Sequence, residues 1–140
     1  MAQRIYLDYN ATAPIRPEVI ELMCEIMHTV GNASSVHEPG RQARQRVETA
    51  RQQVAELVSA SAKNIIFTGS GTEADNLALR GFLPRHLIVS GVEHGAILAP
   101  ALLLDPYATI IEIGPQGQLD IASLEAALNA STEPALVSLM

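Results

Sequence analysis

Residues 65–76 of this chain, Ile-Ile-Phe-Thr-Gly-Ser-Gly-Thr-Glu-Ala-Asp-Asn, decide its fold. The apolar residues at the start of this stretch predict a short strand, and a helix is expected directly behind it, from about Thr72 to Phe82. The two glycines between them let the backbone approach a ligand without side-chain obstruction. The free N–H groups at the start of a helix favour an anion, and the Thr72 hydroxyl adds a further donor. This junction therefore predicts a phosphate site.

Strand and helix patterns alternate with short connections in the rest of the second half. Strands are expected at 86–90, 109–113 and 135–139, and helices at 96–104 and after Asp120, which would N-cap the last one. Pro100 must lie in the first turn of its helix or kink it. The alternation predicts an α/β fold with a largely parallel sheet covered by helices.

The first half of the chain has a different pattern. Residues 1–15 hold turn formers and show no helical or strand period. Two amphipathic helices are expected behind them, from Pro17 to about Val30 and from about Gln42 to Ser59. Arg44 and Glu48 are predicted to form an ion pair one turn apart in the second helix. The four arginines between Arg41 and Arg51 are interpreted as a solvated helix face rather than an anion-binding patch.

Composition excludes several classes of protein. The chain has 140 residues, of which 48% are hydrophobic and 17% charged, so it is not disordered. A net charge of -6 argues against a nucleic-acid binder. A single cysteine, Cys24, excludes an internal disulfide framework and a cysteine-based zinc site. The longest apolar stretch is about half the length of a bilayer span, and no secretory signal pattern begins the chain. We expect a cytoplasmic protein without membrane partners or a bound metal.

Two other interpretations of the glycine junction remain open from the residues alone. It may be read as an ordinary glycine turn in which Thr72 N-caps the helix. Residues 69–74 also fit the dinucleotide-binding pattern G-x-G-x-x-A, for which Glu93 has about the right spacing to act as the ribose-binding acid. Two helices precede the junction, however, whereas a dinucleotide-binding domain usually opens with that strand.

Five stretches carry a wider signal than this junction. They are residues 6–14, 31–37, 67–76, 92–97 and 136–140, which read YLDYNATAP, GNASSVH, FTGSGTEADN, VEHGAI and LVSLM. In this order and spacing they resemble the front part of a class V aminotransferase, specifically a cysteine desulfurase of the pyridoxal-phosphate type. The resemblance covers nearly the whole chain. It implies the front part of the large domain of a fold-type I transferase, with an irregular segment at 1–15 and a partial cofactor-binding domain at 16–140.

The resemblance implies a role for particular residues. Gly71 and Thr72 match the positions that hold the phosphate of pyridoxal 5'-phosphate. His94 matches the histidine that lies flat against the pyridine ring, where an imidazole can also move a proton near the reacting carbon. Asn10 matches a signature asparagine that faces the substrate, and His37 lies in a loop near the active site and the dimer partner. His28 and His86 receive no role.

The family's remaining catalytic groups have no match in this chain. The loop reads Gly-Ser-Gly where relatives often have Ser-Gly-Gly or Ser-Gly-Ala, but the backbone supplies most of the phosphate contacts. Lys63 is the only lysine and does not match the motif of the cofactor-linking lysine, and Cys24 does not match the motif of the sulfur-accepting cysteine. In the family these groups come later. With Met140 following directly on the last strand, we expect the chain to be part of a longer enzyme and inactive alone.

The resemblance implies a homodimeric enzyme that converts L-cysteine to L-alanine and passes the sulfur, as a persulfide, to an iron–sulfur scaffold or another acceptor protein. Alternatives within the family are a selenocysteine lyase and an aminotransferase. The alternative from another class is a non-catalytic dinucleotide-binding module.

Overall fold

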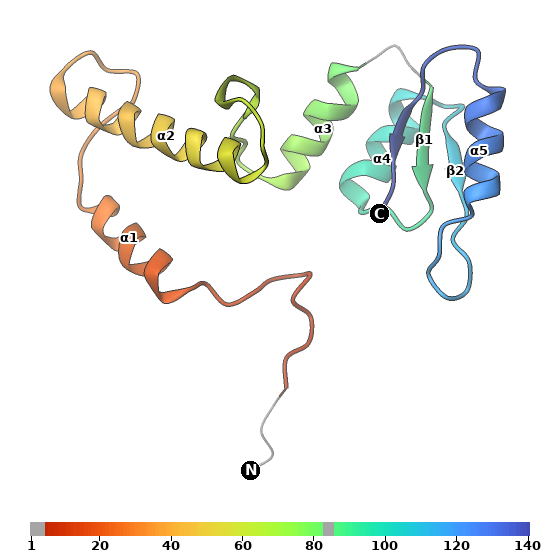
Figure 1. The fold of residues 1–140 in the computed structure, drawn as a ribbon, viewed down its shortest axis with the longest axis horizontal. Coiled ribbons are helices and arrows are strands. Elements are labelled where there is room, and N and C mark those ends of the chain that lie inside the picture. The colour runs from red at the N-terminus through yellow and green to blue at the C-terminus, as the bar shows by residue number, and fades with distance from the viewer. Residues whose placement is uncertain (1–4, 83–85) are drawn as a thin grey trace. The chain divides into compact units, whose positions relative to one another are not determined.

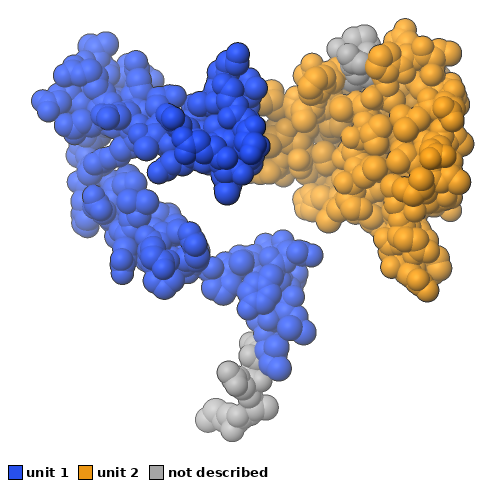
Figure 2. Space-filling view, viewed as in Figure 1, with its two compact units in different colours: residues 1–66 blue, residues 67–140 orange. Residues whose placement is uncertain are grey.

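The computed structural model describes residues 5–82 and 86–140 and divides the chain into two compact units, Met1–Ile66 and Phe67–Met140 (Figure 2). Residues 1–4 of the predicted irregular segment lie outside the described residues. Within the described ranges, no helix is long and apolar enough to cross a bilayer. The two units are described separately.

The first unit is helical after an irregular segment that runs to residue 16. Its elements are α1 (Pro17–Met27), α2 (Glu38–Leu57) and the 3-10 turn η1 (Ala62–Asn64) (Figure 1). A proline opens α1, where a missing N–H costs no intrahelical bond. Helix α2 begins four residues earlier than the sequence pattern predicts, because His37 caps it: the Nδ1 atom accepts the Gly40 N–H at 3.3 Å.

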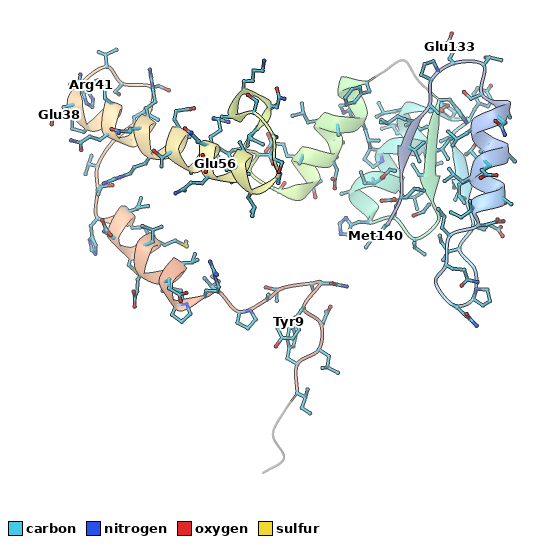
Figure 3. The ribbon with its side chains drawn as sticks, viewed as in Figure 1. Tyr9, Glu38, Arg41, Glu56, Glu133 and Met140 are labelled. Atoms are coloured by element: carbon cyan, nitrogen blue, oxygen red, sulfur yellow. The ribbon has the colours of Figure 1, made fainter. Side chains whose placement is uncertain are left out.

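Arginines of α2 bind the loop that precedes this helix. The Arg41 guanidinium donates to the Val36 carbonyl at 2.6 Å, at the start of α2, where Figure 3 labels Glu38 and Arg41. Arg44 donates to the Ala33 carbonyl at 2.8 Å, so the predicted ion pair of Arg44 with the next turn is wrong. These hydrogen bonds explain why an arginine-rich helix face need not be an anion site, because its guanidinium groups donate to backbone carbonyls of the loop.

The loop also approaches the start of α2 closely at Gly40. A Cβ placed on Gly40 would lie 2.5 Å from the Ser35 carbonyl oxygen and 2.8 Å from that of Asn32. Real Cβ atoms do not come so near to backbone oxygen, so this position accepts only glycine without a shift of the loop.

The second unit is α/β, as predicted. Its elements are α3 (Gly71–Gly81), β1 (Leu87–Ser90), α4 (Gly95–Leu104), β2 (Thr109–Ile111), α5 (Ile121–Ala130) and β3 (Leu136–Ser138) (Figure 1). The three strands are parallel in the order β2-β1-β3, with Ile88 opposite Thr109 and Val137. The sheet is therefore of the predicted largely parallel type.

The core of this unit lies on both faces of β1. All four residues of β1 are buried, as expected of a central strand in a covered parallel sheet. Leu87 and Val89 pack with Leu79 of α3 and Ala101 of α4 in one apolar cluster. Ile88 points to the other face, because successive strand residues alternate, and α5 contacts β2.

One expectation about an individual element needs correction. Residues 65–67 do not form a strand. The Ile65 carbonyl accepts a hydrogen bond from the Arg51 side chain at 2.6 Å instead of one from a neighbouring strand. Glu48 pairs with this same Arg51 at 3.1 Å. Of the two outcomes expected for Pro100, a place in the first turn is excluded, because Pro100 lies further inside α4. The predicted cap is confirmed, since the Asp120 carboxylate accepts the Ser123 N–H at the start of α5.

Candidate functional site

The glycine junction ends in a capped helix, but the cap is not Thr72. Ser70 is the N-cap residue of α3, and its hydroxyl accepts the Glu73 N–H at 3.2 Å. Thr68 supports the same residue by donating its hydroxyl to the Ser70 carbonyl at 3.0 Å. Thr72 is therefore the second residue of the helix, and its hydroxyl is not used to cap it.

Glu73 fixes the loop from the helix side. Its carboxylate accepts the Gly69 N–H at 2.7 Å, so this amide is already bonded. The N–H groups of Gly71 and Thr72 belong to the first turn of α3, where an α-helix supplies no intrahelical acceptor. A Cβ on Gly71 would meet nothing within 4 Å, so the space beside this turn is open. The residues present fit a phosphate group at the helix start, where the helix dipole favours a negative charge.

His94 starts the next helix of the same unit. It is the N-cap residue of α4, and its Nδ1 atom accepts the Ala96 N–H at 3.1 Å. An Nδ1 atom that accepts a hydrogen bond carries no proton, so in the neutral ring the proton is on Nε2. The cap thus fixes both the tautomer of His94 and one edge of its ring, and leaves Nε2 to other partners.

Asn76 joins the first turns of α3 and α4. Its side-chain amide donates to the Thr72 carbonyl at 2.9 Å and to the Ala96 carbonyl at 3.4 Å. The Ala96 carbonyl is available because the residue four positions later is Pro100, which has no N–H to donate. This bridge brings Gly71, Thr72 and His94 to one side of the unit. Asn76 receives no role from the sequence, although a hydrogen-bonding side chain one helical turn after Thr72 is a usable signal.

The site lies at the carboxyl end of β1, where open parallel sheets usually bind ligands. Ser90 ends this strand, is fully buried and donates its hydroxyl to Glu93 at 3.3 Å. The same hydroxyl accepts the Met140 N–H at 3.4 Å, so it also fixes the end of β3. Glu93, the candidate ribose-binding acid of the dinucleotide interpretation, is instead a partner of the strand end.

The remaining predicted residues belong to the first unit. His37 caps α2, and Asn10 lies in a turn in which the Ala11 N–H is bonded to Asp8. Their predicted contacts with substrate or partner stay predictions. Lys63 lies in η1, and Cys24 is an exposed free thiol on α1. Among the described residues, no group of three or more His, Cys, Asp or Glu side chains is placed to hold a metal ion.

A parallel α/β unit with a glycine-loop helix start and a capping histidine at the end of β1 has the general form of an α/β ligand-binding domain. The family model for aminotransferase class-V matches residues 5–140, and the chain belongs to this family. This membership removes the dinucleotide-binding alternative, because the glycine junction lies within the matched region.

Curated relatives extend the match to particular enzymes. The chain is 43% identical to a cysteine desulfurase of Trichormus azollae, over 97% of this chain and 36% of the relative. It is 37% identical to an IscS-like cysteine desulfurase of Mycobacterium tuberculosis, over 96% of this chain and 38% of the relative. The crystal structure of a NifS-like protein from Rickettsia africae matches 98% of this chain and 39% of that protein, with a TM-score of 0.86 and 35% identity. The chain thus spans little more than a third of the relatives' length.

Proposed function

We propose that this chain is the front part of a pyridoxal-phosphate-dependent cysteine desulfurase, which converts L-cysteine to L-alanine and passes the sulfur to an acceptor protein. The observation that carries the proposal is the bond from Asn76 to Ala96, which joins α3 to the helix that His94 caps, in a chain that matches cysteine desulfurases over nearly its whole length. The chain would supply cofactor-binding residues, and the rest of the enzyme the cofactor-linking lysine and the sulfur-accepting cysteine.

Gly71 and Thr72 would hold the phosphate of pyridoxal 5'-phosphate. Their first-turn N–H groups and the Thr72 hydroxyl are suited to phosphate oxygens, and the Gly69 amide is already occupied by Glu73. When bound, the cofactor supplies an electron sink for charge that develops at the substrate's α-carbon. The chain's own contribution is to bind the phosphate and orient the group.

His94 would lie against the cofactor ring and hold a proton. Because its Nδ1 accepts the Ala96 N–H, the neutral imidazole holds its proton on Nε2. A ring held by its own helix start cannot turn away without breaking the cap of α4. His94 is thus suited to donate an Nε2–H hydrogen bond from a fixed direction and to limit tilting of a flat ring packed against it.

The proposal includes a homodimer and a sulfur acceptor such as an iron–sulfur scaffold protein. The names of relatives, several of which are IscS-type cysteine desulfurases, support the cysteine substrate and a sulfur acceptor. The homodimer is proposed from the family resemblance alone. Asn10 and His37 are proposed to face the substrate and the dimer partner. Both belong to the first unit, and their roles depend on the assembled enzyme.

The phosphate site can be tested on the chain itself by NMR. Pyridoxal 5'-phosphate and pyridoxal, which lacks the phosphate, are titrated separately into the ¹⁵N-labelled chain. We expect the phosphate compound alone to shift the amide resonances of Gly71 and Thr72, and Thr72→Val to weaken this binding. Equal shifts with both compounds, or shifts only elsewhere, would contradict the assignment. The longer enzyme should release alanine from L-cysteine.

A further inference from the structure

A second group of reactive side chains lies at the opposite end of β1 from His94. His86 directly precedes β1, Asp105 caps the end of α4, and Thr109 opens β2. The His86 Nδ1 atom is 3.0 Å from an Asp105 carboxylate oxygen, and its Nε2 atom is 2.9 Å from the Thr109 hydroxyl. A hydroxyl, an imidazole and a carboxylate bonded in this order form the arrangement that activates a nucleophile.

Asp105 is held as an ionised hydrogen-bond acceptor. Burial acts to raise its pKa, but hydrogen bonds from the Leu87 and Tyr107 N–H groups and from His86 outweigh burial and hold the pKa below its usual value. The hydrogen bonds from the Leu87 and Tyr107 N–H groups to the Asp105 carboxylate are both 2.9 Å long. An ionised Asp105 requires the proton of neutral His86 to be on Nδ1, so Nε2 presents its lone pair to the Thr109 hydroxyl.

The backbone around these residues is fixed by the sheet. The His86 carbonyl accepts the Leu136 N–H at 2.9 Å, and Thr109 lies opposite Ile88 in the parallel register of β1 and β2. The nucleophile therefore lies on β2, and the base directly precedes β1, where its backbone carbonyl is bonded to the segment next to β3. Groups fixed by strand pairing and by a backbone hydrogen bond are held in place before any substrate arrives, which lowers the entropic cost of reaction.

A cavity of about 680 Å³ opens beside the three residues. His86, Asp105 and Thr109 line it together with Ser131, Thr132 and Glu133. Glu133 is labelled in Figure 3 in the segment before β3. The His86 side chain is 28% exposed, so a small molecule can reach it. Two carboxylates among the lining groups disfavour anions, so the site fits an uncharged molecule.

We propose that Thr109 is a nucleophile activated by His86 and Asp105, which accepts the acyl group of a small uncharged ester. The Thr109 oxygen bonds to the acyl carbon while its proton passes to His86 Nε2. The carbon–oxygen bond of the ester breaks, and the leaving alcohol takes that proton. Water, deprotonated by the same nitrogen, then releases the acid and restores Thr109. No oxidant or cofactor is needed.

The test uses p-nitrophenyl acetate with the 140-residue chain. After a short reaction and an acid quench, mass spectrometry locates the acetyl group. We expect acetylation of Thr109, retained in Thr109→Ser and absent in Thr109→Val, which keeps the β-branched shape. The His86→Gln variant should slow acetylation of Thr109 about a hundredfold, the usual effect of losing a general base.

Circular dichroism of each variant shows whether the fold is kept, and the valine variant is the matched control because it changes only the hydroxyl. Acetyl groups confined to Lys63, Cys24 or His86 in the unmodified chain would overturn the proposal. So would p-nitrophenol release by Thr109→Val at the unmodified rate. The outcome does not depend on pyridoxal phosphate and leaves the proposed desulfurase function untouched.

Discussion

The bond between Asn76 and the Ala96 carbonyl should depend on Pro100. Pro100 lacks the N–H that would bond to this carbonyl within α4, and Asn76 donates to it from α3. Replacing Asn76 by alanine removes this bond and the bond to the Thr72 carbonyl, while alanine itself favours the helix. With a net value of about 0.5–1.5 kcal/mol for each hydrogen bond, we expect Asn76→Ala to destabilise the chain by about 1 kcal/mol.

Replacing Pro100 by alanine should reduce the free energy that the hydrogen bond from Asn76 to the Ala96 carbonyl contributes to stability. Alanine supplies an N–H that can bond to the Ala96 carbonyl within α4, and it removes a residue that costs a helix interior about 3 kcal/mol. Pro100→Ala should therefore stabilise the chain. With the carbonyl already bonded, the bond from Asn76 becomes partly redundant, and Asn76→Ala should cost about 0.5 kcal/mol less in this background.

The assay is urea unfolding of the unmodified chain, both single variants and the double variant, followed by circular dichroism. Asn129→Ala, on an exposed position of α5, is the matched control and should combine additively with Pro100→Ala. Strict additivity of Asn76→Ala with Pro100→Ala would refute the reasoning. The amide resonances of Thr72 and Gly95 should move in Asn76→Ala, because the bridge fixes the two helix starts.

Four further predictions concern single positions. Asp105→Asn should destabilise the chain by about 2–3 kcal/mol near neutral pH, because a carboxylate that accepts three hydrogen bonds is lost. Because the pKa of Asp105 is lowered in the folded chain, its contribution to the free energy of unfolding is present above the unfolded pKa and lost as the pH falls through the folded pKa. A difference in unfolding free energy between the unmodified chain and Asp105→Asn that is the same at pH 3 as at neutral pH, measured with urea, would count against this. Gly40→Ala should lower the thermal unfolding midpoint, whereas Gly81→Ala, where a Cβ meets nothing within 4 Å, should not. The chain alone with pyridoxal phosphate and borohydride should give no stoichiometric adduct on Lys63 and release no sulfide from cysteine, and mass mapping checks this. Cys24→Ala in the longer enzyme should leave desulfurase turnover intact, since Cys24 is an exposed thiol on a helix and does not match the motif of the sulfur-accepting cysteine. Loss of turnover in a folded variant would show the opposite.

The fold of the second unit could be predicted because its signals are local. Apolar runs gave β1, β2 and β3 to within two residues at either end, and Asp120 marked the start of α5 through its own side chain. The predicted strand at 65–67 is wrong because the contact that decides this segment is not local. An apolar run can form a strand only if its carbonyls find a ladder partner, and the Ile65 carbonyl is bonded to a guanidinium from α2, fourteen residues earlier.

The candidate site was predictable where a motif lies in one stretch of chain. Gly71, Thr72 and His94 were named from short motifs, and the structure places them at two helix starts joined by one side chain. Their supports were not predicted. Ser70, rather than Thr72, became the cap because its hydroxyl stands three residues before the Glu73 amide, and sequence alone offers both hydroxyls to the same helix.

The cluster of His86 with Asp105 and Thr109 shows where sequence reasoning ends. His86 received no role because a lone histidine before a strand carries no pattern, and its partners lie 19 and 23 residues away. Only the parallel register, which sets Thr109 opposite Ile88, and the end of α4 bring the three groups together. The two sites of this unit thus depend on different information: the helix starts follow from local motifs, whereas the cluster exists only once β1 and β2 have paired. A change that weakens strand pairing should therefore disturb the Thr109 site before it affects the phosphate site at Gly71 and Thr72.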